Sequence, residues 1–180
     1  MPQSPLDLKA AVVCITGGGS GIGLGLAEQF LKAGSKVIIT GRRESALEAA
    51  QEKFPNIHTF QNDAAKSSER TKLVTWLIET HPNTNILVNN AGIMRRVNAS
   101  CQEEDWAETQ SEIVINLEAP IHLMQLLTPH FLKQPQVGDT RGCHFAEQSP
   151  LPHSWLGMTG CFREPLIWTC VCPTNLRSCL

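Results

Sequence analysis

The chain has 180 residues and a formal net charge of −2 at pH 7. This length is enough for one domain with a substantial core but not comfortably for two. The small net charge gives no reason to expect nucleic acid or an anionic membrane surface as a partner, and no apolar run approaches the ~20 residues of a membrane span. The first residues, Met1–Pro5, lack the basic start and apolar core of a signal peptide. The sequence therefore predicts a soluble, cytoplasmic protein with reduced cysteines.

Short apolar segments alternate with helical patterns over the first three-quarters of the chain. Four segments are predicted to be buried parallel strands, at 10–15, 36–40, 57–60 and 85–88. Helical patterns with polar stops lie between them, at 22–32, 44–53 and 67–80. This alternation predicts an α/β fold with a doubly wound, Rossmann-like parallel sheet and right-handed crossovers.

A glycine-rich turn stands between the first predicted strand and the first predicted helix. It reads Thr16-Gly17-Gly18-Gly19-Ser20-Gly21-Ile22-Gly23. Glycine lets the backbone adopt positive φ and approach a ligand closely. The free N–H groups at the helix start and the positive end of the helix dipole form an anion site. Glycine clusters also arise in ordinary tight turns, but here the flanking strand and helix complete a βαβ unit. The turn therefore predicts a site for a nucleotide pyrophosphate.

A long helix is predicted from Glu112 to Leu132. It is apolar on nearly every side, so it should be buried or lie at a subunit contact. After about Gln136 the pattern changes, because residues 137–180 hold five of the seven cysteines and no lysine and keep no helical or strand period. We predict a domain over 1–136 and an irregular, cysteine-rich tail over 137–180, in which 166–172 could form an isolated strand. No Cys-x-x-Cys pair occurs in the tail, so no metal site is predicted.

With these motifs, residues 6–136 closely resemble the short-chain dehydrogenase/reductase family. The family's Thr-Gly-x-x-x-Gly-x-Gly spacing occurs at Thr16, Gly17, Gly21 and Gly23. Its Asn-Asn-Ala-Gly motif follows the fourth predicted strand, at 89–92. The resemblance implies that the glycine turn holds the cofactor pyrophosphate and that the second motif lines the cofactor site and braces the sheet. The implied cofactor-binding residues in these motifs are Thr16, Gly17, Gly19, Ser20, Gly21, Ile22, Gly23, Asn90, Ala91 and Gly92.

Two further roles follow from the same resemblance. Asp63, followed by Ala64, matches the acidic residue after the third strand that contacts the adenine, although Asp63 could simply cap the next helix. Asn116 matches the family's catalytic asparagine. A buried amide needs hydrogen-bond partners, so a satisfied core amide is the other interpretation of Asn116.

The choice of cofactor can be argued from charge. An NAD enzyme of this fold places Asp or Glu at the end of the second strand, where it accepts from the ribose 2′-hydroxyl. Here Gly41 takes that place and is followed by Arg42 and Arg43. Guanidinium groups can pair with a 2′-phosphate, although two arginines after a strand can also be only a solvated edge. The sequence favours NADP(H).

The family's remaining catalytic residues are a serine and a tyrosine followed four residues later by a lysine. The chain contains no tyrosine, and its last lysine is Lys133. The strands that complete the family's sheet also have no visible counterpart, so the sheet is predicted to be incomplete at its C-terminal side, with an unpaired edge on the fourth strand. We expect an NADP(H)-binding oxidoreductase by family that is catalytically impaired, able to associate through 112–132. The alternatives are a non-catalytic nucleotide-binding or subunit-binding module, and a truncated or frameshifted product.

Overall fold

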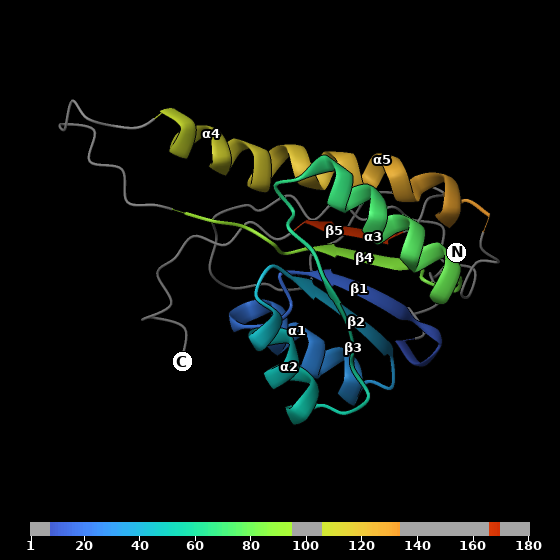
Figure 1. Cartoon of the computed structure of the whole chain (residues 1–180). Helices are drawn as coiled ribbons and strands as arrows, with labels where there is room; N and C mark the ends of the chain where they lie inside the picture. Colours follow the sequence, from blue (N-terminus) through green and yellow to red (C-terminus); the bar gives the residue numbers. More distant parts are fainter. Residues whose placement is uncertain (1–7, 95–105, 134–165, 170–180) are drawn as a thin grey trace, which may run out of the picture.

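The computed structural model describes residues 8–94, 106–133 and 166–169 (Figure 1). Most of the predicted tail, 137–180, therefore lies outside the described residues. The strands are β1 (Val12–Thr16), β2 (Lys36–Gly41), β3 (His58–Gln61), β4 (Ile86–Asn89) and β5 (Leu166–Thr169). The helices are the short 3-10 helix η1 (Leu8–Ala10), α1 (Gly21–Lys32), α2 (Glu44–Lys53), α3 (Ser67–Thr80), α4 (Trp106–Ile113), the π-helical turn η2 (Val114–Glu118) and α5 (Ala119–Phe131).

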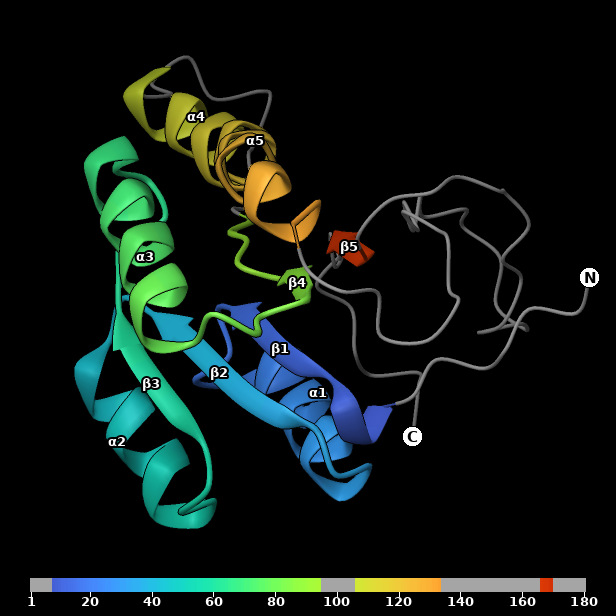
Figure 2. The same cartoon turned by 90° about the vertical axis from the view of Figure 1, so that its right-hand side faces the viewer.

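The strands form one parallel sheet in the order β3-β2-β1-β4-β5. Figure 2 shows α1 and α2 on one face of this sheet and α3 with the α4–α5 segment on the other. The direction in which the strand order runs changes at β1, because β2 and β3 lie on one side of it and β4 and β5 on the other. The predicted doubly wound, Rossmann-like fold is confirmed.

Alternate residues of β1 supply the two halves of the core. Val13 and Ile15 pack toward α1 and α2, in one cluster with residues of β2 and β4. Cys14 points to the opposite face, where Leu73 of α3 and Leu123 of α5 belong to the same cluster. Burial raises the pKa of the Cys14 thiol to about 12, so this cysteine acts as a small apolar side chain. Both faces of the sheet are buried, which explains why its strands are continuous apolar runs.

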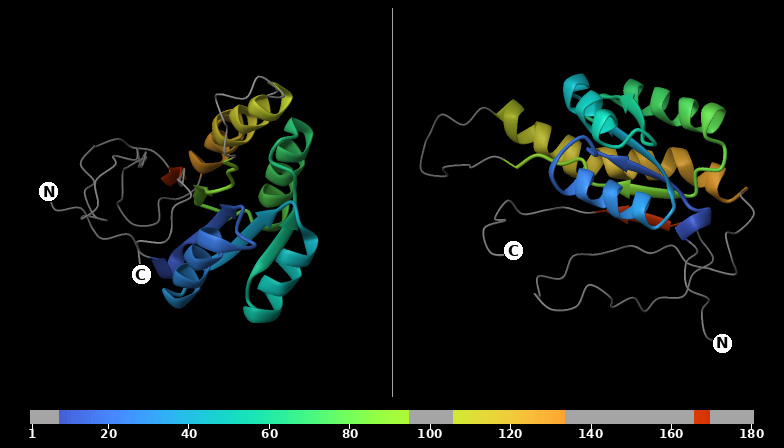
Figure 3. Two further views of the ribbon diagram at one scale, coloured as in Figure 1. Left: turned by 90° about the vertical axis from the view of Figure 1, so that its left-hand side faces the viewer. Right: turned by 90° about the horizontal axis from the view of Figure 1, so that it is seen from below.

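The unpaired edge expected for the fourth strand is not present. β5 lies beside β4 in parallel, and the two are paired from Ile86↔Leu166 to Asn89↔Thr169 (Figure 3). Residues 166–172 were predicted as a possible isolated strand; within them, 166–169 form β5 and provide the edge of the sheet. In the described part of the chain β5 is the last strand on this side.

The predicted long helix is interrupted. The N–H of Ala119 donates to the carbonyl of Val114, which is a π-type bond, and α4 ends and α5 begins on either side of this turn. Pro120 lacks an N–H and its ring would crowd the carbonyl of Asn116 in a regular α-helix, so a wider turn suits this sequence. No helix among the described residues is long and apolar enough to span a membrane.

The α4–η2–α5 segment, which was predicted to be apolar on nearly every side, has three distinct faces. One face is buried against the sheet and α3 and comprises Ile115, Ala119, Leu123, Leu127 and Phe131. A second face is apolar but exposed, through Ile113, Leu117 and Ile121. The third face carries polar side chains that contact other elements of the fold.

Candidate functional site

The glycine turn is joined to the end of β4 by hydrogen bonds. The hydroxyl of Thr16 accepts from the backbone N–H groups of Asn90 (3.1 Å) and Ala91 (3.0 Å). The side-chain Nδ2 of Asn90 donates to the carbonyls of Thr16 (3.0 Å) and Gly17 (3.1 Å). The structure therefore brings Thr16, Gly17, Asn90 and Ala91 together at the carboxyl ends of β1 and β4, the two strands at which the sheet order reverses. In open α/β sheets this is where ligands bind.

Three glycines of the turn are required by space. A Cβ on Gly18 would lie 2.5 Å from Cγ2 of Ile39. A Cβ on Gly17 would lie 2.8 Å from the Cα of Ala91, and one on Gly23 would overlap the Asn90 side chain and the carbonyl of Gly17. Gly17 also has a positive φ of 66°, and Gly21 one of 56°. By contrast, a Cβ on Gly21 would meet nothing within 4 Å, so Gly21 is required for its backbone conformation and not for space.

The start of α1 has the character of an anion site. Its N-cap residue, Ser20, makes no capping hydrogen bond with its side chain. The N–H groups of the first helical turn therefore donate no hydrogen bond to the Ser20 side chain. The positive end of the helix dipole is located there. A glycine cradle that a Cβ would fill, next to an uncapped helix start, fits a bound pyrophosphate. Gly19 and Ile22 belong to the same turn.

Arg43 reaches the glycine turn from the end of β2. Its Nη2 lies 3.3 Å from the hydroxyl of Ser20, and both side chains are on the outside of the molecule. Arg42 is exposed, and its carbonyl accepts from Gln61. A Cβ on Gly41 would lie 3.5 Å from Leu47, an ordinary contact. The position at which an NAD-binding protein of this fold carries an acidic residue thus has room for a side chain.

Asp63 begins the loop that joins β3 to α3. One carboxylate oxygen accepts from the N–H of Ala65 (3.1 Å), and the other lies 4.0 Å from the ammonium of Lys66. The N-cap of α3 is Lys66, so the carboxylate of Asp63 shapes the loop and does not cap the helix itself. The carbonyl of Ala64 points into the molecule and accepts from Arg70 (2.6 Å). Asp63 and Ala64 lie at the carboxyl end of β3, on the same edge of the sheet as the glycine turn.

Asn116 lies in η2 and its side chain is fully engaged. Its Oδ1 accepts from the N–H of Ile93 (2.9 Å), and its Nδ2 donates to the carbonyl of Ile93 (2.7 Å). A Cβ on the neighbouring Gly92 would lie 3.3 Å from the same Oδ1. Asn116 therefore fixes the backbone that follows the Asn-Asn-Ala-Gly motif, which satisfies its amide. A catalytic role for Asn116 stays a prediction.

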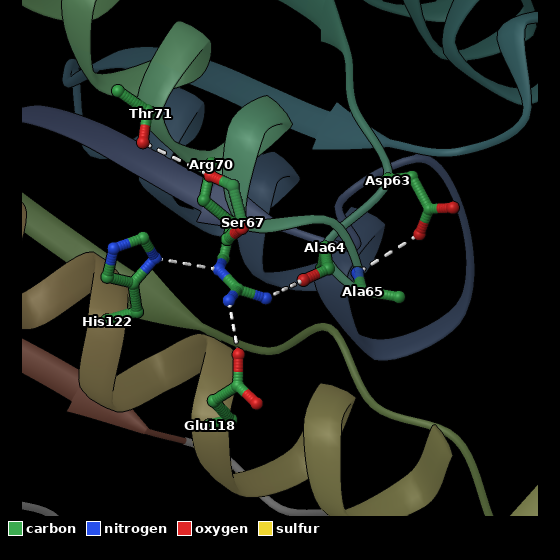
Figure 4. A network of polar contacts seen from close by, with 8 residues as sticks. All are labelled: Asp63, Ala64, Ala65, Ser67, Arg70, Thr71, Glu118 and His122. Atoms are coloured by element: carbon green, nitrogen blue, oxygen red, sulfur yellow. Dashed lines mark hydrogen bonds and ion pairs between the residues drawn. The ribbon is translucent and has the colours of Figure 1, made fainter. Parts of the chain in front are cut away.

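A second polar cluster on this side of the molecule was not predicted from the sequence. Arg70 of α3 is buried and contacts Glu118 of η2 and His122 of α5 (Figure 4). A signal was present in the sequence, because Arg70 shares the helical face of Leu73, Val74 and Leu77, which are buried. A cation at helical spacing from three core residues indicates a buried, partnered charge.

Comparison with known proteins gives a consistent result. A family model described as short chain dehydrogenase matches residues 11–139. The uncharacterized oxidoreductase DltE of Bacillus subtilis (strain 168) is 47% identical over 124 residues, which are 69% of this chain and 49% of that protein. The NADP-dependent (R)-specific alcohol dehydrogenase of Lentilactobacillus kefiri is 35% identical over 114 residues, or 62% of this chain and 44% of that protein.

Solved structures agree with this result. A short chain dehydrogenase from Bacillus anthracis has a TM-score of 0.64 and 32% identity, with 70% of this chain and 53% of that chain covered. The 3-ketoacyl-(acyl-carrier-protein) reductase from Brucella melitensis, complexed with NADH, has a TM-score of 0.63 and 30% identity, with 69% and 51% covered. The chain spans about half the length of the curated relatives it matches.

Proposed function

Because the chain belongs to the short-chain dehydrogenase/reductase family, we propose that it binds NADP(H) at the carboxyl edge of its sheet. A nicotinamide cofactor is expected for the family, and the proposal concerns which one. The observation that carries it is the position of Arg43, whose guanidinium meets the Ser20 hydroxyl beside Gly41. The Arg43 guanidinium and the Ser20 hydroxyl meet at the solvent-exposed side of the glycine turn and are suitable donors to a ribose 2′-phosphate.

The charges around this point favour the phosphate. An acidic side chain at position 41 would repel a 2′-phosphate, and Gly41 has none. Each charge-assisted hydrogen bond from arginine to phosphate contributes about 1.5–3 kcal/mol, reduced here by the exposure of Arg42 and Arg43 to solvent. The relatives differ in this respect, since the Lentilactobacillus kefiri enzyme is named as NADP-dependent and the Brucella melitensis reductase was solved with NADH. The basic residues of this chain favour NADP(H), the cofactor named for the Lentilactobacillus kefiri enzyme.

Titration with the two reduced cofactors tests the proposal. NADPH should bind at least about tenfold more tightly than NADH, which corresponds to about 1.4 kcal/mol. The variant Gly41→Asp should reverse the preference, because its carboxylate can accept from a 2′-hydroxyl and repels a phosphate, and position 41 has space for it. Gln29→Asp is the control, since it makes the same charge change at an exposed position near the far end of α1. Equal affinities in the unsubstituted protein would contradict the assignment.

In the family, the reaction is hydride transfer between a nicotinamide and a carbonyl or alcohol. Of the catalytic residues that the resemblance implies, Asn116 is present. Its side chain bonds the backbone of Ile93, the residue that directly follows the Asn-Asn-Ala-Gly motif. The sequence has no tyrosine, so this 180-residue chain lacks the proton donor of the family. We propose that it binds the cofactor and is catalytically impaired. A non-catalytic nucleotide-binding or subunit-binding module is the second candidate, favoured by the same missing residue. A cytoplasmic location stays a prediction.

Self-association is proposed through the exposed apolar face of the α4–η2–α5 segment. Ile113, Leu117 and Ile121 lie at four-residue spacing and are each about half exposed. Such a face is typical of a contact between helices of two subunits. Sedimentation across a wide concentration range should show a dimer or larger species, and Leu117→Glu should shift it toward monomer. A monomer at every concentration would contradict the proposal.

A further inference from the structure

Arg70 connects three separate elements of the molecule although its side chain is only 1% exposed. Its Nη1 donates to the carbonyl of Ala64 in the loop after β3 (2.6 Å). Its Nη2 contacts the carboxylate of Glu118 in η2 (2.5 Å), and its Nε donates to Nδ1 of His122 in α5 (3.0 Å). Figure 4 shows the guanidinium between these three acceptors. All three of its nitrogens are therefore used, each toward a different part of the chain.

The chemistry of this contact requires arginine. The guanidinium is flat and holds its donors at fixed angles, so it can bind three acceptors in one plane, whereas an ammonium is a single point charge. The only carboxylate bound to Arg70 among the described residues is that of Glu118, whose side chain is 56% exposed. His122 accepts at Nδ1. The buried charge is thus compensated by the carboxylate of Glu118 in η2.

The acceptors of Arg70 lie next to residues of the candidate site. Ala64 follows Asp63, which the resemblance assigns to the adenine. Glu118 is two residues from Asn116 within the same π-helical turn. Asn116 in turn holds both backbone groups of Ile93. A continuous series of direct contacts therefore runs from the loop at 63–64, through Arg70 and η2, to the backbone after the Asn-Asn-Ala-Gly motif.

We propose that Arg70 is a positioning residue that couples the adenosine end of the cofactor site to the Asn116–Ile93 contact. Binding of an adenosine group orders the loop at 63–64, and Arg70 transmits this order to η2 because it holds both. The inference rests on the proposed cofactor site. Arg70 itself lies outside that site and connects its two ends.

The experiment uses adenosine 2′,5′-bisphosphate, which contains the adenosine end of NADPH and no nicotinamide. Amide exchange is followed by NMR, with the N–H of Ile93 as the readout, because that N–H reports the bond to Asn116. In the unsubstituted protein the bisphosphate should bind and slow Ile93 exchange about fivefold, the low end of typical coupling between sites. In Arg70→Met the affinity should fall and the slowing should disappear. Arg70→Lys should fail in the same way, because it keeps the charge and loses the planar donors.

Two further variants separate coupling from stability. Lys72→Met removes an exposed cation from the same helix and should behave as the unsubstituted protein. Glu118→Ala cuts the contact with η2 but leaves the bond to Ala64, so it should retain bisphosphate affinity within about twofold while the slowing of Ile93 falls by at least half. This variant also serves if Arg70→Met does not fold.

The outcomes are distinguishable. If the bisphosphate does not bind the unsubstituted protein, the cofactor assignment fails and the inference fails with it. If it binds but slows Ile93 equally in Arg70→Met, Glu118→Ala and Lys72→Met, the cofactor site stands and Arg70 only stabilises the fold. A loss of coupling in the Arg70 and Glu118 variants alone supports the proposal.

Discussion

The junction of β1 with β4 and the end of β4 differ in whether their buried polar groups have hydrogen-bond partners among the described residues. At the junction, Thr16 and Asn90 bind the backbone on both sides, and Gly17 and Gly23 leave room for those contacts. At the last residue of β4, the side chain of Asn89 is buried, and neither its Oδ1 nor its Nδ2 has a hydrogen-bond partner among the described residues. The polar groups of the first region are thus paired where the two motifs meet, and those of Asn89 are not.

This difference indicates that cofactor binding and catalysis can be separated in this chain. The residues implied in holding the cofactor come from 16–92, which fold as successive βα units. The residues that the resemblance assigns to proton transfer belong to the region past β4, where Asn116 is the one match in these 180 residues and its catalytic role stays a prediction.

The largest expected effect is on turnover. This 180-residue chain should show no measurable carbonyl reduction or alcohol oxidation with NADPH, because a positioned acid contributes ~10²–10⁴ in rate and the chain has no tyrosine. The measurement is NADPH consumption with a panel of aldehydes and ketones. The control is Gly21→Asp, which places a charged side chain at a positive φ where the phosphates are proposed to bind. Robust consumption that Gly21→Asp abolishes would contradict this expectation.

The second prediction concerns the junction and uses two glycines of α1. Gly23→Ala should destabilise the protein by about 1–3 kcal/mol, as overpacking does, and should weaken NADPH binding at least about tenfold, because a Cβ there displaces Asn90 and Gly17. Gly25→Ala is the matched control. A Cβ at Gly25 meets nothing within 4 Å, so this variant should gain about 0.5–1 kcal/mol from its helix propensity. Thermal unfolding and cofactor titration measure both effects.

If Gly23→Ala and Gly25→Ala behaved alike, the close contact between the glycine turn and Asn90 would have no energetic weight. The junction would then be no more tightly specified than the rest of α1.

The local part of the fold could be predicted from the sequence. The four predicted strands differ from β1, β2, β3 and β4 by no more than two residues at either end, because buried parallel strands are continuous apolar runs bounded by polar residues. The glycine turn was found for a similar reason, since its spacing, strand and helix are adjacent in sequence. The resemblance had implied that the motif at 89–92 lines the same site, and residues 16–17 and 90–91 are in contact.

The non-local part could not be predicted. β5 pairs with β4 although about 80 residues separate them, and four apolar residues carry no signal for such a partner. The π-helical turn at 114–118 was not predicted, because the buried apolar residues recur every four positions across it, from Ile115 to Phe131, and give no sign of an interruption. The helical spacing of Arg70 with buried residues of α3 indicates a buried charge, but its three acceptors lie in the loop after β3, in η2 and in α5, which the sequence does not show to be adjacent.

The last prediction, which has the smallest expected effect on cofactor binding, concerns the amino-terminal end of β3. This end of the strand lies away from the carboxyl ends at which the glycine turn is placed. His81, at the end of α3, is 7% exposed, and its ring lies between those of His58 (4.7 Å) and Trp76 (4.9 Å). Its Nδ1 has no hydrogen-bond partner among the described residues. Burial, with smaller contributions from Lys36 and His58, lowers the pKa of His81 from 6.5 to about 4. The folded protein therefore favours the neutral ring.

The sign of the pH dependence follows from these two values. Above pH 6.5 both the folded and the unfolded chain carry a neutral His81, and its contribution to stability is fully present. As the pH falls from 6.5 toward 4, the unfolded chain takes up the proton first, so about 3 kcal/mol of stability should be lost in this window. His81→Phe keeps a ring in the same packing and should remove most of the loss, while His58, whose pKa is also lowered, leaves a remainder. Urea unfolding at pH 7.5 and 4.5 measures the change. At pH 5.5 the protein is still folded, and NADPH affinity should be the same in the unsubstituted protein and in His81→Phe, because the two ends of the strands are separate. A difference in NADPH affinity between the two proteins would show that these ends are coupled through α3.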